Sequence, residues 1–122
     1  MHATVMINLL TENALDDLLQ TSAQNPSKTY AIFKHSTRCN ISSMALNRME
    51  KIDFFEKQDV PFYYLDLIQY RNVSNYVAQK LNVEHQSPQL LFIKNGQCIA
   101  CESHNGIRES WLNEVLPSAN TK

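Results

Sequence analysis

The chain has 122 residues, which is enough for one globular domain with its own core. Apolar side chains make up 43% and charged side chains 19%, and this composition excludes a disordered chain. The 11 basic and 12 acidic side chains nearly cancel, so the charge offers no support for binding to nucleic acid or to a membrane surface. We expect a single domain over residues 1–122, with its packed core at about residues 5–116.

Residues 1–7 lack the basic region of a secretory signal, and no stretch approaches the roughly 18 apolar residues of a membrane span. The chain has three cysteines, and an odd number fits no closed disulfide framework. We therefore expect a cytoplasmic protein whose thiols stay reduced unless they are catalytic.

Strand and helix patterns alternate through the first half of the chain. An apolar run over residues 5–9 predicts a short strand, and Thr11 is a suitable N-cap for the helix that follows. Asn25-Pro26-Ser27 ends that helix. The run from Tyr30 to Lys34 predicts a second, buried strand. Apolar residues at three- and four-residue spacing then predict one long helix from Cys39 to about Lys57.

The second half contains three more predicted strands and two more helices. Asn95-Gly96 is a strong hairpin signal and makes two of these strands neighbours. The elements are, in order, a strand at 62–67, a helix at 73–81, strands at 90–93 and 97–103, and a closing helix around 111–116. The order β-α-β-α-β-α-β-β-α predicts an α/β fold, in which helices flank both faces of a mixed central sheet.

Cys39 is the candidate nucleophile because it falls where a buried strand ends and the long helix begins. The first turn of a helix has unpaired N–H groups and the positive end of the macrodipole, and both favour a thiolate over a thiol. Lys34, Arg38 and His35, which we take for a loop histidine, add positive charge nearby. The alternative is a buried, inert cysteine, which these polar and cationic neighbours disfavour.

The order of elements, with a cysteine at the start of the second helix and a proline before the hairpin, resembles the thioredoxin fold. The resemblance covers about residues 5–116. Its most specific part is Ser87-Pro88, followed by an apolar strand and the Asn95-Gly96 turn. The resemblance implies that Pro88 is a cis-proline that faces Cys39, although cis is the rarer isomer in general.

More narrowly, the segment from His35 to Ser42 is similar to the monothiol bacilliredoxin family. These are bacterial thioredoxin-like proteins of the bacillithiol system, and some are labelled general stress proteins. The family usually reads Thr-Arg-Cys-Pro-Ile-Ser, whereas this chain has Asn40 in place of the proline. Asn40 restores a backbone N–H and removes a rigid φ constraint, so we expect it to affect the reduction potential more than the fold.

Ser42 stands where a dithiol thioredoxin has its second cysteine. A serine can donate a hydrogen bond to the Cys39 thiolate but cannot form a disulfide, which favours a monothiol cycle. Cys39 would attack a mixed disulfide between a target protein and a small thiol, and would take the small thiol onto itself. A second small thiol or a dedicated reductase would then release it.

The resemblance implies that this small thiol is bacillithiol, used as a co-substrate by a protein without a tightly bound cofactor. The residues alone leave glutathione or another small thiol open. The implied partners are thiol-modified target proteins and a reducing system. Arg38 could bind a carboxylate of the small thiol in bidentate fashion. The predicted substrate-binding residues are Thr37, Arg38, Asn40, Ser87 and Pro88.

Cys98 and Cys101 form a second Cys-x-x-Cys spacing, within the predicted strand at 97–103. In a strand, residues three apart point to opposite faces and lie roughly 10 Å apart, which is too far for a disulfide. A zinc site would need a second pair of ligands, for which only the scattered His85 and His104 are present. We expect both cysteines to fill space, and the alternative is that one of them resolves a disulfide formed by Cys39.

Two other functions stay open at this point. Asn40 and Ser42 are compatible with a non-catalytic thioredoxin-fold binding protein that has lost turnover. A dithiol oxidoreductase would pair Cys39 with Cys98 or Cys101.

Overall fold

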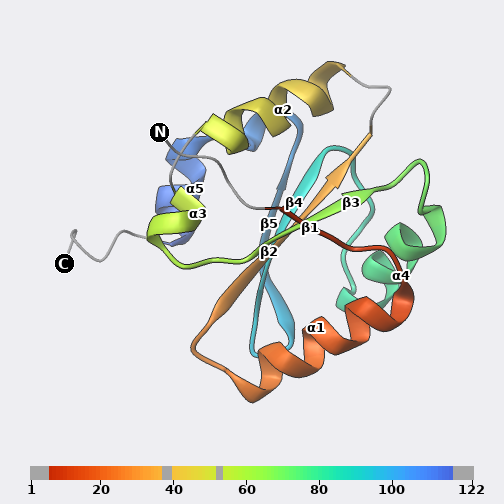
Figure 1. Ribbon diagram of the computed structural model, residues 1–122. Coiled ribbons are helices and arrows are strands. Elements are labelled where there is room, and N and C mark those ends of the chain that lie inside the picture. Colours follow the sequence, from red (N-terminus) through yellow and green to blue (C-terminus); the bar gives the residue numbers. More distant parts are fainter. Residues whose placement is uncertain (1–5, 37–39, 52–53, 117–122) are drawn as a thin grey trace.

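A five-stranded mixed sheet forms the centre of the molecule in the computed structural model, which describes residues 6–36, 40–51 and 54–116 (Figure 1). The strands lie in the order β1-β3-β2-β4-β5. β3 runs parallel to both β1 and β2, whereas β4 runs antiparallel to both β2 and β5. The strands are β1 (Met6–Asn8), β2 (Thr29–His35), β3 (Phe62–Asp66), β4 (Gln89–Lys94) and β5 (Gln97–Ser103). This arrangement confirms the predicted mixed sheet.

The helices cover both faces of this sheet, as predicted. They are α1 (Glu12–Gln24), α2 (Asn40–Lys51), α3 (Phe54–Lys57), α4 (Arg71–Leu81), α5 (Glu109–Val115) and the short 3-10 helix η1 (His104–Gly106). Buried side chains of α2, α3 and α5 pack on one face, and buried side chains of α1 and α4 pack on the other. Figure 1 shows the two groups of helices on opposite sides of the strands.

The residues predicted to form one long helix from Cys39 to about Lys57 include α2 and α3, whereas Cys39 and residues 52–53 lie outside the described residues. The buried stripe of α2 includes Ala45 and Met49, and a continuous helix would carry this stripe on to position 56. Glu56 is instead exposed, while Phe54 and Phe55 are both buried. The change of phase turns the two aromatic rings into the core beside Phe92.

Two local predictions are confirmed. The Thr11 side chain accepts a hydrogen bond from the Ala14 N–H at 3.0 Å and caps α1. Asn95 and Gly96 join β4 to β5 with φ values of 54° and 73°, the left-handed conformations that a tight hairpin turn requires. The Gly96 N–H donates to the Ser22 hydroxyl at 2.9 Å, which ties the hairpin to α1.

A β-bulge changes the faces of β5. Cys101 pairs with Leu91 and Cys98 pairs with Ile93, and the register shifts by one residue between these pairs. Leu91 and Ile93 point to the same face of β4, so Cys98 and Cys101 also share a face. The prediction that they point to opposite faces is therefore wrong, because Ile99 is an extra residue in the strand.

Within the described ranges, no helix combines the length and the apolar character that crossing a bilayer requires.

Candidate functional site

The predicted site lies at the junction between β2 and α2. β2 ends at His35 and α2 begins at Asn40, which is the residue after Cys39 in the sequence. Thr37, Arg38 and Cys39 lie outside the described residues, as does the side chain of Asn40. Their predicted roles in catalysis and substrate binding therefore stay predictions. The structure describes the side chains that surround this junction.

Ser42 joins the end of β2 to the first turn of α2. Its side chain is fully buried, its hydroxyl accepts a hydrogen bond from the Ser36 N–H at 3.0 Å, and the same oxygen lies 2.7 Å from His35 Nδ1. A serine hydroxyl has one proton to donate. The hydroxyl uses it on Nδ1 when that nitrogen is unprotonated, and keeps it for another acceptor when Nδ1 carries its own proton. The predicted hydrogen bond to a Cys39 thiolate thus depends on whether His35 Nδ1 carries a proton, which the tautomer of the ring also decides.

His35 is the last residue of β2 and is buried, not a loop histidine. Its ring lies 5.6 Å from the ring of Tyr64 and stacks on Phe33 at 6.0 Å, measured between centroids. Burial lowers the pKa of His35, and this effect outweighs the nearby carboxylates of Asp66 and Glu50, which raise it. The imidazole is therefore mainly neutral at pH 7, and it does not supply the positive charge that we expected.

Lys34 points to the other face of the sheet, away from His35. Its side chain is fully buried, and Nζ donates to the Ser74 carbonyl at 3.1 Å and lies 3.2 Å from His85 Nδ1. Burial lowers the pKa of Lys34 to about 8. Burial and the charges of Lys34 and Arg71 also lower the pKa of His85. The amine links β2 to α4 and to the loop before Pro88.

The peptide bond between Ser87 and Pro88 is cis, the isomer that the resemblance implies. The Pro88 carbonyl accepts a hydrogen bond from the His104 N–H at 3.1 Å, which connects the loop to η1. The buried Ser87 hydroxyl and the buried Gln89 Oε1 have no hydrogen-bond partner among the described residues. Two polar atoms beside the cis-proline thus remain without a protein partner in this part of the chain. The position of Pro88 relative to Cys39 lies outside the described residues.

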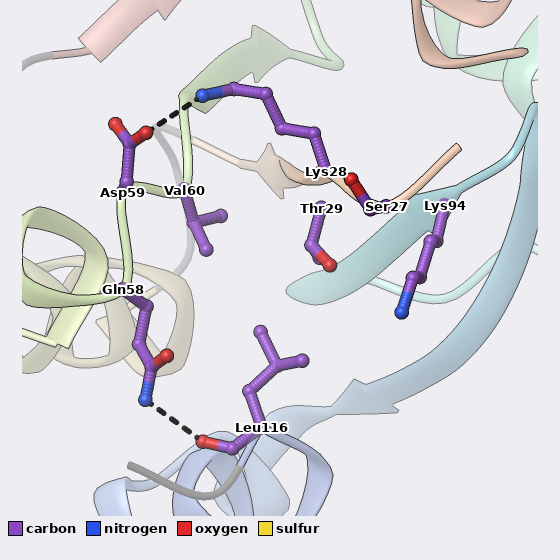
Figure 2. Close-up of a pocket in the computed structure, with 8 residues that line it drawn as sticks. All are labelled: Ser27, Lys28, Thr29, Gln58, Asp59, Val60, Lys94 and Leu116. Atoms are coloured by element: carbon purple, nitrogen blue, oxygen red, sulfur yellow. Dashed lines mark hydrogen bonds and ion pairs between the residues drawn. The ribbon is translucent and has the colours of Figure 1, made fainter. Parts of the chain in front are cut away.

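A pocket of about 420 Å³ lies at the opposite end of the sheet (Figure 2). Thr29 and Lys94 line the pocket and pair with each other, at the start of β2 and the end of β4. His35 lies at the opposite end of β2. Figure 2 shows Lys28 paired with Asp59 at 3.0 Å and the Gln58 amide donating to the Leu116 carbonyl at 3.1 Å. Lys28, Asp59 and Gln58 therefore have partners within the pocket, and the pocket is separate from the predicted site.

No group of three or more histidine, cysteine, aspartate or glutamate side chains is arranged to hold a metal ion in the part of the chain that the structure describes. The contacts of His35 with Ser42 and of Lys34 with His85 were not predicted. The only sequence signal for them was a polar pair, Lys34-His35, placed at the end of an otherwise apolar strand.

Comparisons with known proteins agree with this architecture. A family model described as monothiol bacilliredoxin BrxC matches residues 7–112. A solved structure described as a candidate oxidoreductase with a thioredoxin fold is 32% identical, with a TM-score of 0.77, and the match covers 90% of this chain and 92% of that one.

Two thioredoxins resemble the chain in fold alone. The thioredoxin of Fasciola hepatica is 23% identical, with a TM-score of 0.67 over 90% of this chain and 95% of its own. A thioredoxin from Nicotiana alata is 18% identical, with a TM-score of 0.72 over 94% of this chain and 92% of its own. Together, the structural matches confirm the predicted thioredoxin fold.

Proposed function

Because the chain belongs to the monothiol bacilliredoxin family, we propose that it removes bacillithiol from mixed disulfides on proteins, with Cys39 as the nucleophile. The family match includes Cys39 and the serine that replaces a second cysteine at position 42. The main structural support for the proposal is the environment of Ser42. This serine is buried in the first turn of α2 and hydrogen-bonds to His35 and Ser36 at the end of β2, so this turn is built around a hydroxyl that cannot resolve a disulfide.

The reaction is one thiol–disulfide exchange followed by release. The Cys39 thiolate attacks the sulfur of the small thiol in the mixed disulfide, a new disulfide forms on Cys39, and the target cysteine leaves as a thiolate. A second small thiol then attacks the Cys39 adduct and leaves as the symmetrical small disulfide. A dedicated reductase could perform the same release.

The surroundings of the junction support this chemistry. α2 begins at Asn40, so its unpaired N–H groups and macrodipole favour negative charge at its N-terminus. The Ser87 hydroxyl beside Pro88, which has no hydrogen-bond partner in the part of the chain that the structure describes, is suited to receive a polar group of the substrate. Arg38 is suited to a carboxylate of the small thiol, and Thr37 completes the substrate-binding set. The proposal places the reaction in the cytoplasm, with thiol-modified proteins as targets and a reducing system as partner.

The test is reactivation of an enzyme whose active-site cysteine is blocked by bacillithiol. Wild-type protein should restore its activity and should gain one bacillithiol adduct by intact mass, because nothing at position 42 displaces it. The Cys39→Ala variant should do neither. As the matched control, the variant with both Cys98→Ser and Cys101→Ser should retain most of the transfer.

Two results would overturn the proposal. If the Cys39→Ala variant reactivated the enzyme at the wild-type rate, Cys39 would not be the nucleophile, and a non-catalytic role for the protein would be favoured. A wild-type product with a disulfide from Cys39 to Cys98 or Cys101, in place of the adduct, would favour a dithiol mechanism. Parallel reactions with glutathione-blocked enzyme distinguish the two small thiols.

A further inference from the structure

The bulge in β5 places Cys98 and Cys101 side by side on one face of the sheet. Their partners in β4 are Ile93 and Leu91, which lie two residues apart. Two residues of a strand span about 6.6 Å, which is within the range of about 4.4 to 6.8 Å that a disulfide allows between Cα atoms. The Cys101 thiol is also close enough to Cys98 to raise the pKa of that thiol. The regular strand geometry that argues against a disulfide does not apply here.

The two thiols differ in access. Cys101 is exposed, whereas Cys98 is half-buried against the core cluster on the face that α1 and α4 cover. The Cys98 thiol donates to the Ala100 carbonyl at 3.4 Å. Burial, and then the neighbouring Cys101, raise the pKa of Cys98 to about 11. Cys101 is therefore the thiol that reacts first with a reagent in solution, and the less accessible Cys98 reacts after it.

We propose that Cys98 and Cys101 form a second redox couple, which a low-molecular-weight disulfide converts into an intramolecular disulfide. The Cys101 thiolate attacks one sulfur of the small disulfide, forms a mixed disulfide and releases one small thiolate. Cys98 then gives up its proton to that thiolate, attacks the Cys101 sulfur and releases the second small thiol. The two protein thiols lose two electrons and two protons, and the small disulfide takes up both and leaves as two thiols.

This couple is separate from the proposed Cys39 reaction. Buried side chains of α2 pack on one face of the sheet, and Cys98 packs on the other. No carboxylate or histidine joins the two cysteines in a group of three among the described residues, so a redox pair fits them better than a metal site. The protein would thus carry one cysteine, Cys39, that keeps a small thiol as an adduct. It would also carry one pair, Cys98 and Cys101, that releases the small thiol.

The experiment uses the full chain with Cys39→Ser, so that only the β5 thiols react. Glutathione disulfide is the probe, and intact mass and alkylation are the readouts. We expect a product lighter by two hydrogen atoms, without an adduct, that does not react with an alkylating reagent and regains both thiols on reduction. In the same background, Cys98→Ser should stop at one glutathione adduct on Cys101, because its resolving thiol is absent.

Two outcomes would contradict the proposal. One is a glutathione adduct that persists on Cys101 while Cys98 is present. The other is a protein in which both thiols remain open to alkylation under oxidant concentrations that load Cys101 in the Cys98→Ser variant. Circular dichroism of each variant checks that the chain is still folded. None of these outcomes depends on whether Cys39 transfers bacillithiol.

Discussion

Ser42 connects two parts of the chain through one oxygen atom. The Ser36 N–H donates to it from the end of β2, and His35 Nδ1 lies 2.7 Å away. Because the hydroxyl proton goes to Nδ1 only when that nitrogen is unprotonated, the tautomer and the charge of this histidine change which group Ser42 can donate to. The serine that replaces the second thiol therefore also connects the end of β2 to the first turn of α2.

The Ser42→Ala variant should lose about 1–3 kcal/mol of unfolding free energy, since it leaves buried polar groups of Ser36 and His35 without this partner. Urea denaturation measures the change. Ser43→Ala is the matched control, because Ser43 lies next to it in α2 and is only half-buried. Equal losses in the two variants would show that the oxygen of Ser42 has no such role.

At the scale of elements, β2 carries two adjacent buried polar side chains on opposite faces. His35 faces α2, and Lys34 faces α4, where it contacts the Ser74 carbonyl and His85. A charged amine is disfavoured there, because burial lowers its pKa from 10.5 to about 8. Below about pH 8, Lys34 stays protonated in the folded protein, and burial of this charge lowers the stability of the fold. Between about pH 8 and 10.5 the unfolded state binds more protons, so stability rises with pH.

Replacing Lys34 by Met should remove this pH dependence. We expect the stability of wild type, relative to Lys34→Met, to increase as the pH rises from about 8 to 10.5. Chemical denaturation of both proteins at several pH values gives the difference, in which the effects of other groups cancel. Lys51→Met serves as the control because it removes an exposed lysine in place of a buried one. A constant difference for Lys34→Met would contradict the prediction.

The elements also show what could be predicted from the sequence. The apolar runs of β2 and β4 and the Asn95-Gly96 turn are local signals, so the strands and the hairpin were predicted correctly. The bulge at Ile99 was not, because one extra residue leaves no mark in a Cys-x-x-Cys spacing. The contact of His35 with Ser42 was missed as well, since it forms only when the strand end meets the first turn of α2.

At the scale of the whole molecule, α1 is fixed to the β4–β5 hairpin through Gly96. Its N–H donates to the buried Ser22 hydroxyl, and its φ is 73°. A Cβ atom at this position would lie 3.4 Å from both the Ala23 Cβ and the Leu19 carbonyl oxygen. The turn therefore needs glycine for its conformation, whereas a Cβ would meet α1 at van der Waals distance.

The Gly96→Ala variant should lose about 1–2 kcal/mol of unfolding free energy, because a side chain disfavours the positive φ of this position. Thermal unfolding or urea denaturation can measure it. The neighbouring Asn95→Gly change is the control: Asn95 also has a positive φ, of 54°, which glycine adopts without strain. An alanine at position 96 that costs no more than a glycine at position 95 would contradict this account.

The bulge in β5 has a consequence for how the protein behaves at high concentration. β5 is the last strand of the described sheet, and only β4 pairs with it. A long, regular outer strand would offer its free N–H and C=O groups to a second molecule, and such edges seed aggregation. The extra residue at Ile99 interrupts the spacing of these groups, so a neighbouring chain cannot continue the sheet in register. The irregularity that brings two cysteines together thus also keeps separate molecules apart.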